Sequence, residues 1–95
     1  MSHSYDDFLS CLEQNFLLEH GDYKDELQLV KVEQLANSQT VDGSTAFSVI
    51  FQSSNQNPIP QQIYQLSNDT MGELQLFIVP IAQDEAGVRY EAVFS

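Results

Sequence analysis

The sequence predicts a mainly β fold of the α+β type, in which one N-terminal helix precedes about six antiparallel strands that form a small barrel or a strongly coiled sheet. Two observations support this class. After residue 15, apolar residues alternate with polar residues in short runs, which is typical of half-buried strands. Turn residues separate these runs at hairpin spacing. The chain has 95 residues and no linker-like stretch, so a single domain over 1–95 is expected.

A helix is expected over residues 4–14. Ser4 can cap its N-terminus, and Asp6 and Asp7 follow in the first turn, where the helix dipole favours negative charge. The apolar side chains recur at helical spacing and predict one buried stripe, formed by Tyr5, Phe8, Leu9 and Leu12. Such a helix would cover an open end or a face of the sheet.

The strands are expected at about 16–19, 27–35, 46–53, 62–67, 73–81 and 88–94. The second of these has a phase slip, because Leu27 and Leu29 fall on one parity and Val30 and Val32 on the other. Either a β-bulge lies near residues 29–30, or this strand is buried on both faces.

The two C-terminal strands are expected to form one long hairpin. Its apolar face combines two alternating sets, Leu74, Leu76 and Ile78, then Val88, Tyr90, Ala92 and Phe94. Pro80 cannot donate a ladder hydrogen bond, which indicates a bulge or an edge position. Gly87 is expected to supply a positive φ at the return of the hairpin. Before the hairpin, Pro58 and Pro60 mark residues 53–60 as a loop.

The chain is strongly acidic. It has 14 Asp and Glu residues against three basic residues, Lys24, Lys31 and Arg89, and its net charge is −11. Such a surface repels nucleic-acid phosphates and anionic lipids, so neither nucleic acid nor a membrane is expected as a partner, whereas a basic protein is compatible. No signal-peptide pattern is present, and no apolar run approaches the roughly 20 residues that cross a bilayer, which favours a cytoplasmic location.

The sequence shows no recognisable catalytic motif, and no catalytic residue, cofactor or metal is expected. Cys11 is interpreted as a small buried apolar residue, although His3 lies close to it in sequence. One possible metal cluster is interpreted as an exposed turn, because it lacks the paired His or Cys ligands of zinc sites and the regular spacing of calcium loops; it consists of His20, Asp22, Asp25 and Glu26. The pair Asp84 and Glu85 is interpreted as exposed residues of a hairpin tip, which rarely provides the pocket that acid–base catalysis needs.

Arg89, Glu91 and Tyr64 are the candidate contacts for a protein partner. Arg89 and Glu91 lie two residues apart and project from the face opposite Tyr90. The structural interpretation of Arg89 is an ion pair with an acid on a neighbouring strand. An alternative function is an enzyme or small-ligand binder whose barrel mouth is lined by Tyr64, Tyr90 and Arg89. A third, an acidic mimic of nucleic acid, requires regular rows of carboxylates, whereas the acids here are spread over turns and both ends of the chain.

Four segments together resemble a family of small bacterial domains of unknown function. They are residues 47–51 (FSVIF), 60–66 (PQQIYQL), 72–81 (GELQLFIVPI) and 87–94 (GVRYEAVF). That family has the C-terminal signature LxLFLVPI…GxRYEAVF and no established catalytic role. The resemblance implies that the gene lies near genes for phage-tail-collar-like proteins. It therefore implies a non-enzymatic, acidic protein-interaction or accessory module that serves a phage-tail-like or surface-fibre assembly.

Overall fold

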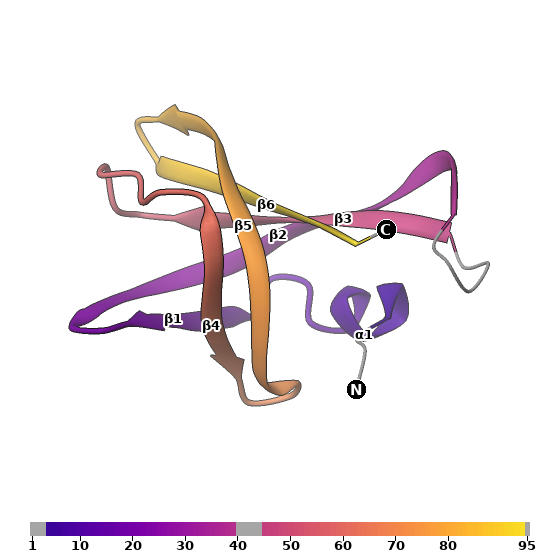
Figure 1. Cartoon of the computed structure of the whole chain (residues 1–95), viewed down its shortest axis with the longest axis horizontal. Coiled ribbons are helices and arrows are strands. Elements are labelled where there is room, and N and C mark those ends of the chain that lie inside the picture. The colour runs from indigo at the N-terminus through magenta and orange to yellow at the C-terminus, as the bar shows by residue number, and fades with distance from the viewer. Residues whose placement is uncertain (1–3, 40–44, 95) are drawn as a thin grey trace.

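The computed structural model describes residues 4–39 and 45–94, which form one short helix and six strands (Figure 1). In chain order the elements are α1 (Tyr5–Leu9), β1 (Asn15–His20), β2 (Tyr23–Gln39), β3 (Thr45–Ser53), β4 (Gln62–Asn68), β5 (Gly72–Asp84) and β6 (Gly87–Phe94). Neighbouring strands pair antiparallel throughout. The prediction of a mainly β fold with an N-terminal helix and about six antiparallel strands is confirmed. The helix α1 is too short to span a membrane, and no other helix occurs in the described residues.

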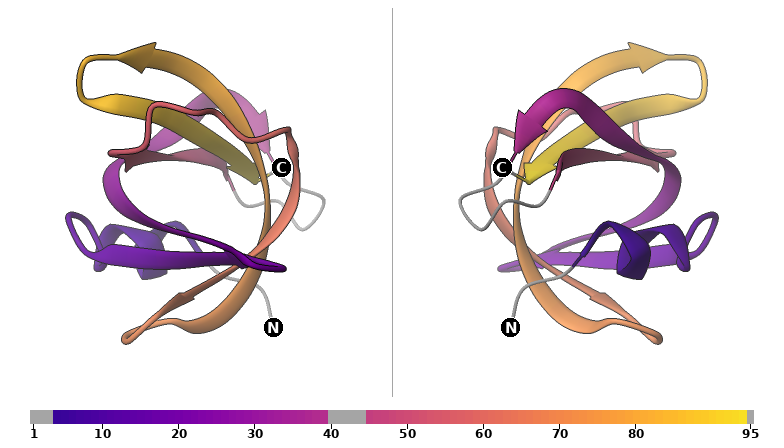
Figure 2. Two further views of the ribbon diagram at one scale, coloured as in Figure 1. Left: turned by 90° about the vertical axis from the view of Figure 1, so that its left-hand side faces the viewer. Right: turned by 90° about the vertical axis from the view of Figure 1, so that its right-hand side faces the viewer.

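The six strands close into a barrel in the order β1-β2-β3-β6-β5-β4, and β4 returns to pair with β1 (Figure 2). The closing contact is short and consists of three residue pairs, Leu17 with Ser67, Leu18 with Leu66, and Glu19 with Gln65. The sequence left a barrel and a coiled sheet open, and the barrel is the form observed. Each strand of the ring therefore has a hydrogen-bonded neighbour on both sides.

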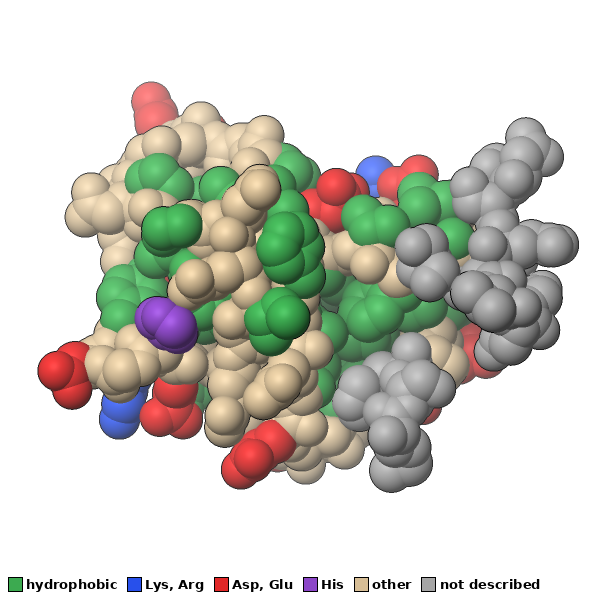
Figure 3. All heavy atoms as spheres, in the orientation of Figure 1, with side chains coloured by type: hydrophobic (Ala, Val, Ile, Leu, Met, Phe, Trp, Pro, Cys, Tyr) green, Lys and Arg blue, Asp and Glu red, His purple; other side chains and the backbone are tan. Residues whose placement is uncertain are grey.

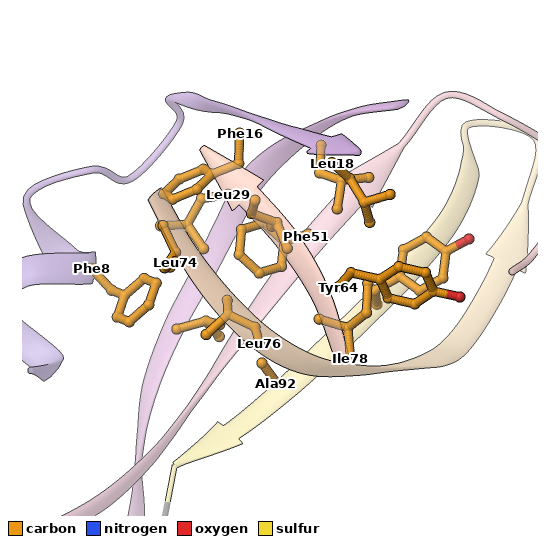
Figure 4. Packing of buried hydrophobic residues seen from close by; sticks show 14 of the residues in the cluster. Phe8, Phe16, Leu18, Leu29, Phe51, Tyr64, Leu74, Leu76, Ile78 and Ala92 are labelled. Carbon is orange, nitrogen blue, oxygen red and sulfur yellow. The ribbon is translucent and has the colours of Figure 1, made fainter. Parts of the chain in front are cut away.

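The barrel interior is packed with side chains from all six strands. Alternate residues of each strand point inward, as the two-residue period of a β-strand requires. Phe8 of α1 lies at one end of this core, and Tyr64 lies toward the other (Figure 4). The ring centroid of Phe8 is 5.1 Å from that of Phe94 and 6.0 Å from that of Phe47. The helix therefore packs on one end of the barrel through the buried ring of Phe8 and the partly buried ring of Tyr5, whose centroid lies 5.9 Å from that of Phe47.

The N-terminus of α1 is capped by a reciprocal pair of hydrogen bonds. The Ser4 hydroxyl accepts from the Asp7 backbone N–H at 3.2 Å, and the Asp7 carboxylate accepts from the Ser4 N–H at 3.0 Å. Asp6 and Asp7 occupy the first turn, where the helix dipole favours them. The capping role expected for Ser4 is therefore present.

The helix ends earlier than the spacing of apolar residues predicts, at Leu9 rather than near residue 14. After Leu9 the chain continues in tight turns to Glu13, which adopts a φ of 72°. The Glu13 N–H donates to the Leu29 carbonyl at 2.7 Å, so the chain here already pairs with β2. Leu12, expected on the buried stripe, is consequently 41% exposed.

The phase slip in β2 is a β-bulge. Leu29 pairs with Phe51, and Lys31 pairs with Ile50, so Val30 is an extra residue between them. The Val30 side chain is 39% exposed, which excludes burial of the strand on both faces at this point. β2 also begins before the expected 27–35, because it pairs with β1 from its first residues. It ends later, at Gln39, which pairs with Thr45 of β3.

A second bulge lies in β5. The pairing with β6 shifts register between Pro80 and Ala82, so Ile81 is the extra residue and Pro80 lies beside a bulge, not at a sheet edge. Gly87 has a φ of 126°, and a Cβ added there would lie 1.9 Å from the Ser53 carbonyl oxygen. The positive φ expected of Gly87 is confirmed, and the close approach of β3 adds a steric requirement for glycine.

Candidate functional site

The loop of residues 54–61 between β3 and β4 is fastened to the barrel by two buried tyrosines. The Tyr90 hydroxyl accepts from the Ile59 N–H at 3.1 Å, and the Tyr64 hydroxyl donates to the Pro60 carbonyl at 2.7 Å. The two residues are 0% and 2% exposed. Both hydroxyls thus hold the loop, which counts against the alternative in which these tyrosines line an open mouth for a small ligand.

A polar network beside these tyrosines joins β2, β3 and the same loop. The Asp25 carboxylate accepts hydrogen bonds from the Ser53 hydroxyl and, at 3.4 Å, from the Tyr23 hydroxyl. The Asn55 side chain donates to the Tyr23 oxygen at 3.3 Å, and the Asn55 N–H donates to the Ser53 hydroxyl oxygen at 3.0 Å. Among the described residues, every buried side-chain nitrogen and oxygen has a hydrogen-bond partner. The side chains of this network therefore find their hydrogen-bond partners within the network, as is usual for polar groups with a structural role.

Tyr23 and Tyr90 have raised pKa values, which makes them poorly suited to act as general bases. Burial raises the pKa of Tyr90, and the hydrogen bond from the Ile59 N–H lowers it only in part. Burial also raises the pKa of Tyr23, and the negative charge of Asp25 acts in the same direction. Because a general base works best with a pKa near the ambient pH, these shifts move both hydroxyls away from that role.

The acidic turns named from the sequence do not converge on a common point. The His20 ring packs edge-on against the Tyr64 ring, with centroids 5.1 Å apart. The Asp84 carboxylate accepts a hydrogen bond from the Ala86 N–H at 2.9 Å within the exposed β5–β6 turn, and Glu85 is exposed beside it. Within residues 4–39 and 45–94, no three His, Cys, Asp or Glu side chains are placed to hold a metal ion together.

Cys11 is enclosed in the core and is 0% exposed. Its sulfur lies 3.8 Å from the Asn68 side-chain oxygen and 3.9 Å from the Ser10 hydroxyl. His3, the neighbour that could activate a thiol, lies outside the described residues. The burial agrees with the interpretation of Cys11 as a small apolar residue.

The three candidate partner contacts lie on two sides of the barrel wall. Tyr64 points into the core, whereas Arg89 is exposed on the outer face of β6, and Glu91 is half-buried on that same face. Arg89 Nε donates to the Gln52 side-chain oxygen at 3.0 Å, because Gln52 is its partner on β3. The ion pair expected of Arg89 is not formed with any acid of the described residues, so its neighbour is a neutral amide.

Apolar side chains on the outer face of the β4–β5 hairpin, three exposed and one half-buried, form what we call the outer patch, which consists of Ile63, Phe77, Val79 and Ile81. Ile63 and Phe77 are directly paired across the two strands and are 62% and 52% exposed. Ile81 is 48% exposed, and Val79 is half-buried. In Figure 3, hydrophobic side chains lie over β5 near the middle of this face, and Asp and Glu side chains lie toward its outline.

Sequence reasoning identified the inner face of β5 and missed this outer one. The signal was present, because residues 76–81 are apolar on both parities. Once Leu76 and Ile78 point inward, Phe77 and Val79 must point outward. A strand in a closed barrel needs one apolar face only, so the second is not required by the core.

A shallow cleft of about 650 Å³ lies near the β4–β5 turn and the end of the α1–β1 connection. Four carboxylates line it, from Glu13, Glu26, Asp69 and Glu73. Leu17 of β1 adds an apolar side chain that is 37% exposed. Glu73 points to the same side of β5 as Phe77, so the cleft and the outer patch share one face.

Comparison with known proteins places the chain in a family without assigning it an activity. No curated protein and no solved structure matches it. One family, described as a domain of unknown function (DUF6916), matches residues 3–94, which is nearly the whole chain. The chain therefore belongs to the DUF6916 family.

Proposed function

We propose that the protein is a non-enzymatic interaction module that binds another protein through the outer patch, as an accessory of a larger assembly. The observation that carries this proposal is the exposure of Ile63 and Phe77, which are paired side by side near the start of β4. A contiguous exposed apolar surface on a small domain commonly marks a site that another molecule covers. A phage-tail-like or surface-fibre assembly is the setting that the family resemblance implies.

The barrel offers a rigid platform for such a contact. β4 and β5 pair without interruption from Asn68 and Gly72 to Gln62 and Ile78, so Ile63 and Phe77 lie on a regular ladder. Its inner face is anchored by buried residues of the core, including Leu74, Leu76 and Ile78. The backbone beneath these side chains is already ordered, so binding costs little backbone conformational entropy, which favours affinity.

The proposal is tested by affinity capture of the tagged protein from its source cells, with partners quantified by mass spectrometry. The informative variant is Phe77→Ser. The matched control is Val30→Ser, which removes another exposed apolar side chain from a strand that touches neither β4 nor β5 in the ring. We expect a near-stoichiometric partner with the wild type and the control, and roughly 10-fold lower recovery with Phe77→Ser.

Equal recovery by Phe77→Ser and the wild type contradicts the proposal, as does the lack of any near-stoichiometric partner for the wild type. Circular dichroism of both variants shows that the comparison is made between folded proteins. Because Phe77 is half exposed, its replacement is not expected to unfold the barrel.

A further inference from the structure

We infer that the outer patch binds a segment of a different protein in which apolar side chains are joined to Lys or Arg residues, rather than a second copy of this chain. The inference rests on the proposed function and adds the chemistry of the partner. It follows from the order of side chains along β5, from the free carboxylates of the cleft and from the positions of the three basic residues.

The outer face of β5 changes from acidic to apolar along one line. Glu73, Gln75, Phe77 and Val79 alternate with inward residues and therefore share that face. Their partners on β4 are Ser67 opposite Glu73, Gln65 opposite Gln75, and Ile63 opposite Phe77. At about 3.3 Å per residue, roughly 13 Å separates Glu73 from Phe77 along the strand. A partner that covers the patch therefore extends over the cleft if its binding segment is longer than this.

The carboxylates of the cleft carry charge that the described residues do not neutralise. Glu13, Asp69 and Glu73 form no ion pair with a basic side chain of the described residues. Glu26 accepts a hydrogen bond from the neutral Asn15 amide at 2.7 Å and remains exposed. Positive groups of a partner are thus favoured over the cleft, and phosphate or carboxylate groups are repelled.

A second copy of the chain offers the cleft few positive groups, and only Arg89 among them has no acidic partner in the described residues. Lys31 is already paired with Glu33 at 2.9 Å, and Lys24 lies 3.9 Å from Glu19. Arg89 donates its Nε to Gln52. Two copies, each with a net charge of −11, would also repel one another as their faces approached.

The closed ring restricts how a partner can bind. Each strand of the ring has a hydrogen-bonded neighbour on both sides for part of its length, which leaves a partner no complete strand edge to extend. The side chains of the outer face are the larger surface that a partner can contact. An apolar anchor over Ile63 and Phe77, with Lys or Arg about 13 Å away over the cleft, fits that surface.

A displayed library of random 15-residue peptides provides the probe. Peptides selected on the wild-type protein are sequenced, and the affinities of the best binders are measured by fluorescence anisotropy at low and high salt. The apolar contact is tested with Phe77→Ser against Val30→Ser. The charge contact is tested with the double variant Asp69→Asn/Glu73→Gln against Asp22→Asn/Glu85→Gln, which removes the same two charges from exposed turns elsewhere.

We expect the selected peptides to combine aromatic or aliphatic residues with at least two Lys or Arg residues. Phe77→Ser should weaken their binding about 10-fold, and Asp69→Asn/Glu73→Gln about 5-fold. High salt should weaken the binding of these peptides to the wild-type protein, because it screens the charge contact. Neither control variant should weaken binding more than about 2-fold.

Three results would overturn the inference. The first is a set of selected peptides without enriched Lys and Arg, or no selected binders at all. The second is equal weakening by the two charge variants. The third is a wild-type dimer in analytical ultracentrifugation that Phe77→Ser dissociates, because the occupant would then be a second copy. If capture from cells still depends on Phe77 while the partner's binding is insensitive to Asp69→Asn/Glu73→Gln and to salt, the proposed function stands and this inference fails.

Discussion

The backbone N–H of Ile59 donates a hydrogen bond to the Tyr90 hydroxyl, 3.1 Å away, and so ties the β3–β4 loop to the C-terminal strand. The loop contains two prolines and no regular structure, so its position depends on such contacts. Tyr64 makes the second one, through the Pro60 carbonyl. The two hydroxyls hold the second half of the loop over the barrel, while Asn55 and Gln56 fasten its first half.

The variant Tyr90→Phe should therefore loosen the loop with little change in the core. The free energy of unfolding should fall by about 1 kcal/mol, because one hydrogen bond to a backbone N–H is lost. Urea unfolding measures that change, and limited proteolysis within residues 54–61 should become faster. Tyr5→Phe is the control, since no hydrogen bond engages the Tyr5 hydroxyl among the described residues. Unchanged proteolysis of Tyr90→Phe would show that the loop is held by other contacts.

Stability should also fall in alkali for a reason linked to the same residues. Burial raises the pKa of Tyr23 and Tyr90 in the folded state above the ordinary value of 10.0. The protonated forms are thus favoured by folding. Their contribution is complete below pH 10.0 and is lost as the pH rises through the folded-state pKa values. Urea midpoints measured across this range should decline, and Tyr90→Phe should decline less steeply. An equal slope for both proteins would contradict the assignment to Tyr90.

Gly87→Ala should be far more damaging than the same change at another turn. The added Cβ would lie 1.9 Å from the Ser53 carbonyl oxygen, and the φ of 126° is itself unfavourable for alanine. We expect a loss of about 3 kcal/mol or more, or failure to fold. Gly72→Ala is the matched control, because its φ is 75° but no atom lies within 4 Å of the added Cβ. That variant should lose about 1–2 kcal/mol. Equal losses measured by urea unfolding would mean that β3 and β6 separate at this point without difficulty.

Phe8→Ala and Leu12→Ala test how the N-terminal segment closes the barrel. Phe8 is 0% exposed and Leu12 is 41% exposed, although helical spacing puts both on one stripe. Phe8→Ala should lose about 3–5 kcal/mol through the cavity it leaves, and Leu12→Ala less than about 1 kcal/mol. Thermal and urea unfolding of the two variants give the comparison. Similar losses would indicate that the helix continues to residue 14 in solution.

The strands were predictable because their signal is local. Alternation in Leu74, Leu76 and Ile78, and again in Val88, Tyr90 and Ala92, reports which side of a strand is buried, and the burial agrees. Closure of the barrel was not predictable to the same degree, because it depends on three residue pairs between β1 and β4. A pairing between segments distant in sequence leaves no periodic pattern of its own.

The helix end was predicted wrongly and the outer patch was missed, for different physical reasons. The helix stops because Glu13 pairs with Leu29, a tertiary contact that outweighs local spacing. The patch was visible as the apolar Phe77 and Val79 between inward residues, but a core-based interpretation accounts for one face only. Arg89 was a candidate contact because it is one of only three basic residues. In the structure its Nε donates a hydrogen bond to the neutral side-chain amide of Gln52.

The place of β6 in the ring has a consequence for synthesis of the chain. β6 lies between β3 and β5, so both of these strands have an open edge until residues 87–94 have left the ribosome. A nascent chain that lacks β6 exposes unpaired strand edges and the apolar side chains that Val88 and Tyr90 would cover. The barrel consequently forms after translation of this segment, and a stalled or truncated product is the species most prone to aggregate.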